Sequence, residues 1–155
     1  MKRILSLLCL MLMLSLVAFA KGNEMPQYDI TGAGSGNEGM LLVKVFVYSK
    51  KVTDQDLKRA AVHGVVFLGC SGNNSGAKQP AMAPAESEAS HSEFCNGFFA
   101  AQGECQNYAS IIAGSYERVK TSKGVKSGAI VQVDKKALRK ALEKAGVVRS
   151  LSAGF

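Results

Sequence analysis

The sequence lacks the short motifs that identify common enzyme classes. Neither Gly-x-Ser-x-Gly nor His-Glu-x-x-His occurs in it, and no internal repeat is present. Three glutamates, Glu86, Glu88 and Glu93, lie in a polar stretch where solvation accounts for them, so no carboxylate pair for acid–base catalysis is evident. Nothing in the motifs therefore indicates an enzyme. With 47% apolar and 20% charged residues, the 155-residue chain does not fit the disordered, collagenous or multi-pass membrane classes, and its length suits one domain.

The N-terminus has the pattern of an export signal. Lys2 and Arg3 precede an apolar run over residues 4–20, which ends in Ala18-Phe19-Ala20, small residues at the positions that a signal peptidase recognises. We expect a signal peptide at residues 1–20 that is cleaved after Ala20. The alternative is an uncleaved anchor, because the 17 residues of this run can just span a bilayer.

Removal of the leader leaves a moderate excess of positive charge. The whole chain has 19 basic and 12 acidic residues, and loss of Lys2 and Arg3 leaves a net charge of +5. Such an excess suits an anionic neighbour, either a membrane surface or an acidic envelope protein, and it is also compatible with plain solubility. Nucleic acid is not an expected partner, because the protein is exported and its aromatic residues are not interleaved with basic ones.

Three cysteines follow the leader: Cys70, Cys95 and Cys105. An oxidising compartment favours one disulfide and leaves one thiol over. The Cys95–Cys105 pair closes a short loop that contains two glycines, and it is the pairing we expect. Pairing of Cys70 with either of the others stays open on sequence grounds, as does a state in which all three are reduced and buried.

Hydrophobic periodicity predicts a single α+β domain over residues 21–155. We expect an antiparallel sheet of about four strands, two main helices packed on one face of the sheet, and a long flexible loop. The expected elements are strands at 28–33 and 40–49, a helix from 53 to 68, a loop at 71–92, a short helix around 94–99, strands at 110–119 and 127–133, and a helix from 134 to 146.

Local patterns indicate which side chains of these elements face the core. Val43, Val45 and Val47 alternate along the second strand and are expected to be buried. Thr53 and Asp56 have the spacing of a capping box at the start of the first helix. The apolar stripe that we expect on the sheet in this helix comprises Leu57, Ala60, Ala61, Val65 and Leu68.

A glycine pattern, Gly34-x-Gly36-x-x-Gly39, matches the dinucleotide-binding fingerprint letter by letter. The binding mechanism needs a helix directly after the glycines, because the helix N-terminus holds the pyrophosphate. A strand is expected from Met40 instead. The pattern therefore predicts a hairpin turn or a bulge rather than a nucleotide site.

Cysteine and histidine residues are the remaining candidates for catalysis or metal binding. His91 and Cys95 are four residues apart, which places both on one helical face, but no further ligand lies at a familiar metal spacing. Cys70 follows a helix C-terminus, where the helix dipole raises the pKa of a thiol and weakens it as a nucleophile. We expect no metal, cofactor or catalytic residue. The alternative is a small thiol- or metal-dependent periplasmic enzyme that uses Cys70 or the His91/Cys95 pair.

The last predicted helix is the best candidate for an interaction surface. Basic side chains crowd its outer side, and basic residues outnumber acidic ones from Arg118 onward. A solvated helix face is the plain alternative. The expected binding face comprises Lys135, Lys136, Arg139, Lys140 and Lys144.

Two stretches, residues 60–69 and residues 127–146 with Gly154-Phe155, resemble small exported proteins of unknown function from Gram-negative bacteria of the Bacteroides type. The resemblance implies a cell-envelope setting and supplies no activity or functional residue. We therefore expect a non-enzymatic binding or assembly accessory domain. Its expected location is the periplasm, the outer membrane or the exterior of the cell.

Overall fold

The computed structural model describes residues 24–72, 78–122 and 124–150, and it confirms the α+β class. Several predicted elements lie where expected, and others differ in ways described below. In chain order the elements are β1 (Tyr28–Ser35), β2 (Met40–Val47), α2 (Asp54–His63), a π-helical turn (Gly64–Leu68), α3 (Glu86–Ser90), α4 (Ser92–Phe98), a 3₁₀ helix (Glu104–Tyr108), β3 (Ala109–Ile111), β4 (Glu117–Thr121), β5 (Gly124–Asp134) and α5 (Lys135–Lys144).

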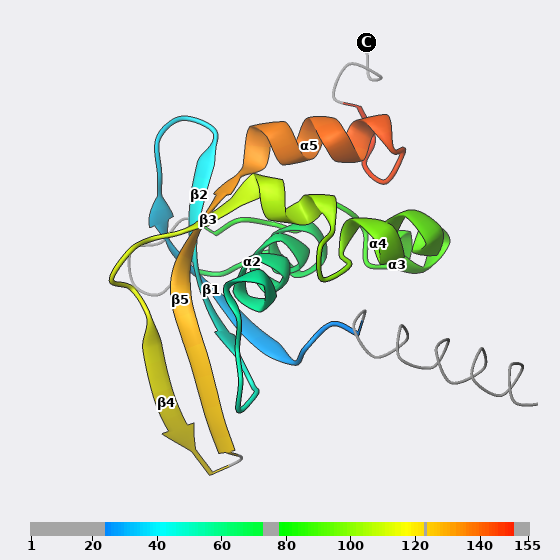
Figure 1. The fold of residues 1–155 in the computed structure, drawn as a ribbon. Helices are drawn as coiled ribbons and strands as arrows, with labels where there is room; N and C mark the ends of the chain where they lie inside the picture. The colour runs from blue at the N-terminus through cyan, green and yellow to red at the C-terminus, as the bar shows by residue number, and fades with distance from the viewer. Residues whose placement is uncertain (1–23, 73–77, 123, 151–155) are drawn as a thin grey trace, which may run out of the picture.

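The strands form one antiparallel sheet in the order β1-β2-β5-β3. β4 pairs with the first half of β5, on the side where β3 pairs with the second half. Helices α2, α3, α4 and α5 all lie on one side of this sheet (Figure 1). The hairpin of β4 and β5 extends away from the helices, at the end of the molecule opposite α5 (Figure 1). The expected arrangement of two main helices on one sheet face is confirmed, with five strands in place of about four.

The glycine pattern forms the turn between β1 and β2, as predicted. Gly34 and Gly39 have φ angles of +135° and +84°, which side chains other than glycine rarely adopt. The pairing of β1 with β2 shifts register between Gly32 and Gly34, so a bulge precedes the turn. Because β2 follows directly, this turn has no helix N-terminus that could hold a pyrophosphate.

The core lies between β2, β5 and the helices. Val43, Val45 and Val47 are fully buried, which confirms the alternation predicted for this strand. The predicted capping box is also present, since Thr53 Oγ1 accepts from Asp56 N and the Asp56 carboxylate accepts from Thr53 N. Both features depend on near neighbours in sequence, which is why the sequence predicts them.

The prediction that Leu68 faces the sheet is wrong. This side chain is 63% exposed, although Val65 in the same segment is fully buried. The helix widens here into a π-helical turn in which Gly69 N donates to Gly64 O at 2.8 Å. A π turn holds more residues than an α turn, so it rotates Leu68 away from the face that the 3.6-residue period predicts.

Part of the predicted loop 71–92 is ordered secondary structure. Residues 73–77 of it lie outside the described residues, but Cys70 pairs with Gln79 through two backbone hydrogen bonds of 2.8 Å. Met82 N and Ala83 N both donate to Val66 O, and α3 begins at Glu86. α3 was not predicted because a five-residue helix with only Ser87 buried has no apolar period.

The predicted strand at 110–119 is instead split into β3 and β4. At the break, the Ser115 side chain takes the place of a backbone hydrogen-bond partner from a neighbouring strand. Its Oγ accepts from Ile130 N at 2.9 Å and donates to Ile112 O at 2.6 Å. Gly114, with a φ of +75°, turns the chain out of the sheet at this point. A serine side chain that substitutes for a backbone partner has no signature in hydrophobic periodicity.

The transition from β5 to α5 is as predicted. Asp134 caps α5 by accepting from Ala137 N at 2.8 Å. Leu138 and Leu142 are fully buried and attach the helix to the core. The helix ends at Lys144; Gly146, whose φ is +76°, follows the C-cap residue, and Val147 N then donates to Leu142 O at 3.0 Å. α5 therefore has one buried face and one face turned away from the sheet.

Candidate functional site

The five basic residues predicted as a binding face all lie on α5, but the structure divides them into two groups. Arg139 donates to Glu143 at 2.9 Å, and Lys135 donates to the side chain of Gln79 at 3.0 Å. Lys136, Lys140 and Lys144 are exposed. Their spacing of four residues places them in one row along the helix. We call this row the basic stripe.

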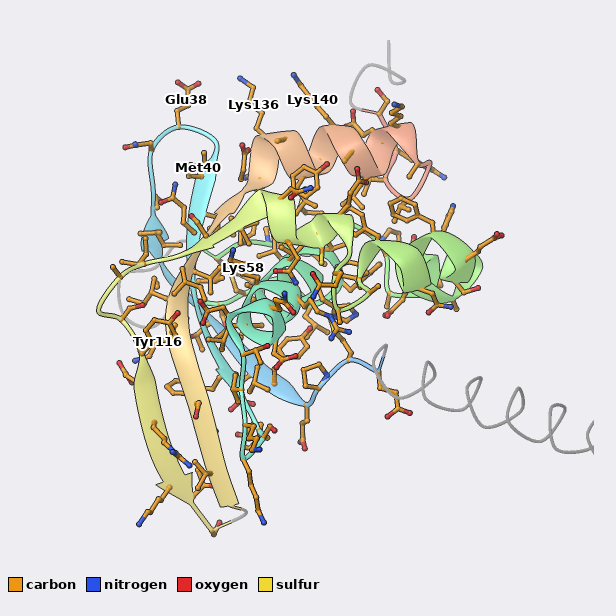
Figure 2. The ribbon with its side chains drawn as sticks, in the orientation of Figure 1. Glu38, Met40, Lys58, Tyr116, Lys136 and Lys140 are labelled. Carbon is orange, nitrogen blue, oxygen red and sulfur yellow. The ribbon has the colours of Figure 1, made fainter. Side chains whose placement is uncertain are left out.

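The direction of the basic stripe follows from how α5 is fixed. The Asp134 cap and the buried side chains of Leu138 and Leu142 hold the opposite face of the helix on the core. Lys136 and Lys140 accordingly extend away from the body of the protein (Figure 2). The charges of the stripe are thus presented together, with their ammonium groups in solvent.

An apolar groove runs beside the basic stripe, between α5, α4 and the 3₁₀ helix. Its volume is about 650 Å³, within the range of about 300–1,000 Å³ common for small-molecule sites. Lys140 and Lys144 border it on one side and Glu104 on the other. We call it the α5 groove; its apolar lining consists of Phe94, Tyr108, Ala137, Ala141 and Ala145.

The groove exists because small residues face large ones across it. Ala137 and Ala141 of α5, and Ala145 directly after it, leave space that leucines at these positions would fill. On the other side, the rings of Phe94 and Tyr108 lean on Phe98, with centroid distances of 5.1 and 5.9 Å. Phe98 is itself buried, so it gives the two groove aromatics a fixed support. The wall is therefore preformed rather than dependent on a ligand.

This arrangement can hold an elongated apolar group that ends in a negative charge. The methylene stems of Lys140 and Lys144 extend the apolar surface, while their ammonium groups reach the solvent. An acyl chain could lie on the alanines and aromatics, with its anionic head at the lysines. Glu104 repels a negative group on its own side of the groove. The anionic head is therefore expected on the opposite side, at Lys140 and Lys144.

The expected Cys95–Cys105 disulfide is wrong. All three cysteines in the described ranges, Cys70, Cys95 and Cys105, are free and buried. The Cys95 thiol lies near Glu88 and the Cys105 thiol near Arg59, so the two sulfurs have different surroundings. Burial raises the pKa of each thiol, in the case of Cys105 to about 11. A buried thiol with a raised pKa is a weak nucleophile at neutral pH.

The other sequence candidates do not come together. His91 and Cys95 share one helical face by spacing, but they line different hollows, and His91 Nδ1 lies 3.0 Å from Ser87 O. His63 is packed at the rim of the core, with its side chain 12% exposed. Sequence reasoning missed two features: the α5 groove, and a hydrogen-bonded chain from Tyr28 through His63 to Glu88.

No helix within residues 24–72, 78–122 and 124–150 is both long and apolar enough to cross a membrane. In the same part of the chain, no group of three or more His, Cys, Asp or Glu side chains is placed to hold a metal ion. Comparisons with protein-family models, with curated proteins and with solved structures give no match.

Proposed function

We propose that this protein is an exported, non-enzymatic accessory domain of the cell envelope that binds an anionic lipid surface. The basic stripe of α5 meets the headgroups, and the α5 groove receives one acyl chain. The observation that supports this proposal most is the position of Lys140 and Lys144, which belong to the stripe and also border the apolar groove. Charge and apolar surface are thus combined at one place, as the two ends of a lipid require.

The expected energies are those of a reversible membrane attachment. A lysine near an anionic membrane contributes about 1 kcal/mol, so the three lysines of the stripe contribute about 3 kcal/mol. When an acyl chain covers the apolar wall of the groove, each Å² of wall removed from water adds about 25 cal/mol. Either source alone gives marginal attachment, whereas stable attachment takes two signals. The basic stripe provides the electrostatic signal, and the α5 groove provides the apolar one.

Two further observations favour binding over thiol chemistry. The raised pKa values of the buried cysteines leave little thiolate for catalysis at neutral pH. The export signal predicted at residues 1–20 lies outside the described residues; an exported protein of the envelope would meet a membrane surface, which supports the proposal. An acidic envelope protein is the competing partner for the same lysines.

A vesicle experiment tests the proposal. The protein, purified after export by its host, is sedimented with phosphatidylglycerol vesicles and with phosphatidylcholine vesicles at low and high salt. We expect a preference of about a hundredfold for the anionic vesicles at low salt, because about 3 kcal/mol corresponds to two factors of ten. This preference shrinks at high salt, since salt screens exposed charges. Equal binding to both vesicles, or none to either, contradicts the proposal.

A further inference from the structure

A second hollow, separate from the α5 groove, lies between the start of the described chain, the end of α2, and helices α3 and α4. Its volume is about 540 Å³, and it shares no lining residue with the α5 groove. Met25 and Phe99 provide apolar wall, and Ser92 and Asn96 provide neutral polar groups. We call it the acidic pocket, because Glu24 and Glu88 also line it.

The Glu88 carboxylate is held in position by a hydrogen-bonded chain that runs from the partly buried Tyr28 to the surface. Tyr28 Oη lies 2.6 Å from His63 Nδ1, and His63 Nε2 lies 3.0 Å from Glu88 Oε1. A carboxylate only accepts, so in the neutral ring Nε2 donates to Glu88 and Nδ1 accepts from the Tyr28 hydroxyl. Glu88 itself is about half exposed, at 47%, so it still faces a ligand.

Aromatic rings fix the histidine at the centre of this chain. The His63 ring lies 5.8, 5.1 and 5.2 Å from the rings of Tyr28, Phe67 and Phe99 by centroid distance. The imidazole is thus enclosed on several sides and cannot turn freely. Glu88 is therefore aimed by packed neighbours and does not behave as a mobile surface glutamate.

The pocket is negative, although the whole chain has a formal net charge of +7. Among the described residues, no lysine or arginine lines it. Burial raises the pKa of Cys95 in the pocket wall and of Tyr28 behind it, and the nearby negative charge of Glu88 raises both pKa values further. Arg59 is buried behind the wall, where its guanidinium donates to Phe99 O at 2.8 Å and to the backbone carbonyl of Glu24 at 3.5 Å.

We propose that the acidic pocket binds a small alkylammonium group, with the ammonium at Glu24 and Glu88 and its alkyl chain against Met25 and Phe99. Carboxylates that accept from an ammonium form charge-assisted hydrogen bonds, the strongest class that such a pocket offers. The apolar wall selects an amine with a short carbon chain over a bare inorganic cation. A free amine and a lysine side chain of a peptide share this chemistry.

Calorimetric titration with three five-carbon probes tests the charge preference. We expect pentylamine to bind to the exported, purified protein at least tenfold more tightly than pentanol or pentanoate. Comparable affinity for all three probes, or no heat from pentylamine, overturns the proposal. A capped Ala-Lys-Ala peptide then distinguishes the sources: if it binds at least as tightly as pentylamine, the ligand is a peptide lysine, and weaker binding identifies a free amine. Both results require the proposed ammonium site.

Matched variants locate the binding. Glu88→Gln removes the charge and keeps an oxygen that accepts from His63, so pentylamine affinity is expected to fall at least tenfold while the melting temperature stays near that of the parent. Glu93→Gln makes the same charge change on α4 outside the pocket lining, and affinity is expected to stay the same. If E88Q is folded and binds as the parent does, the proposal is wrong. Vesicle binding by E88Q is expected to be unchanged. A failure of the amine-binding proposal can therefore be distinguished from a failure of the lipid-binding proposal.

Discussion

The variant K136E/K140E/K144E is expected to lose binding to anionic vesicles. Removing the three lysines alone takes away about 3 kcal/mol, and the glutamates add repulsion, so affinity falls by more than about a hundredfold. The three side chains are exposed, so the melting temperature is expected to change little. Co-sedimentation with phosphatidylglycerol vesicles measures the loss, and circular dichroism checks the fold.

A control with the same change in net charge separates the stripe from the charge of the whole protein. K50E/K51E/K120E alters exposed lysines in the turn after β2 and on β4. β4 lies at the end of the molecule opposite α5 (Figure 1). We expect this control to keep most of its vesicle binding. A loss equal to that of the stripe variant shows that net charge, and not α5, attracts the membrane.

The substitution Gly69→Ala is expected to have the largest effect on stability. Gly69 follows the π-helical turn with φ +68° and ψ −174°, a conformation close to exclusive to glycine. A Cβ atom there would lie 2.5 Å from Gln79 O and 2.7 Å from Ala81 N, both of which are backbone atoms. Strain and clash together are expected to cost at least about 3 kcal/mol, or about 10 °C in melting temperature.

Gly97→Ala is the matched control, with an effect of opposite sign. Gly97 lies in the last turn of α4, and a Cβ atom added to it would meet no atom within 4 Å beyond the adjoining helix backbone. Alanine is favoured over glycine by about 0.5–1 kcal/mol in the middle of a helix, so we expect a gain at the lower end of this range. Thermal unfolding of the two variants under the same conditions gives the comparison. A G69A protein as stable as G97A contradicts the backbone geometry described for residue 69.

The parts of the fold that the sequence predicts depend on near neighbours in the chain. The alternation of Val43, Val45 and Val47, the Thr53 cap and the Asp134 cap each involve residues no more than four positions apart. Their physical causes are the period of a strand and the unpaired N–H groups at a helix start. Such rules act before any tertiary contact is known.

The errors arise where a distant contact overrides a local rule. Leu68 leaves the predicted face because a π turn changes the helical period. The strand breaks at Ser115 because its hydroxyl bonds with Ile130, fifteen residues away. We expected the disulfide because the loop is short and the compartment is oxidising. The surroundings of Cys95 and Cys105 are instead set by how α4 and the 3₁₀ helix pack.

The candidate sites also differ in whether they depend on near neighbours in the sequence or on distant contacts. The basic residues of α5 are visible in the sequence, because their spacing on one helix is local. The α5 groove is not, since Phe94 and Tyr108 approach α5 from segments roughly 30 to 50 residues earlier in the chain. One signal was present: the apolar residues of α5 alternate between alanines, Ala137 and Ala141, and two fully buried leucines, Leu138 and Leu142. Alanines at such positions leave room for a partner.

The most direct test of acyl-chain binding uses a tryptophan placed in the α5 groove. The natural sequence contains no tryptophan, so Phe94→Trp introduces a single fluorescent reporter in the groove wall. Tyr116→Trp serves as the control, because Tyr116 is 54% exposed and lies away from α5 (Figure 2). With phosphatidylglycerol vesicles brominated on their acyl chains, we expect strong quenching of the F94W protein and little quenching of Y116W. Equal quenching of the two proteins, or none in F94W while the protein is vesicle-bound, would contradict entry of an acyl chain into the groove.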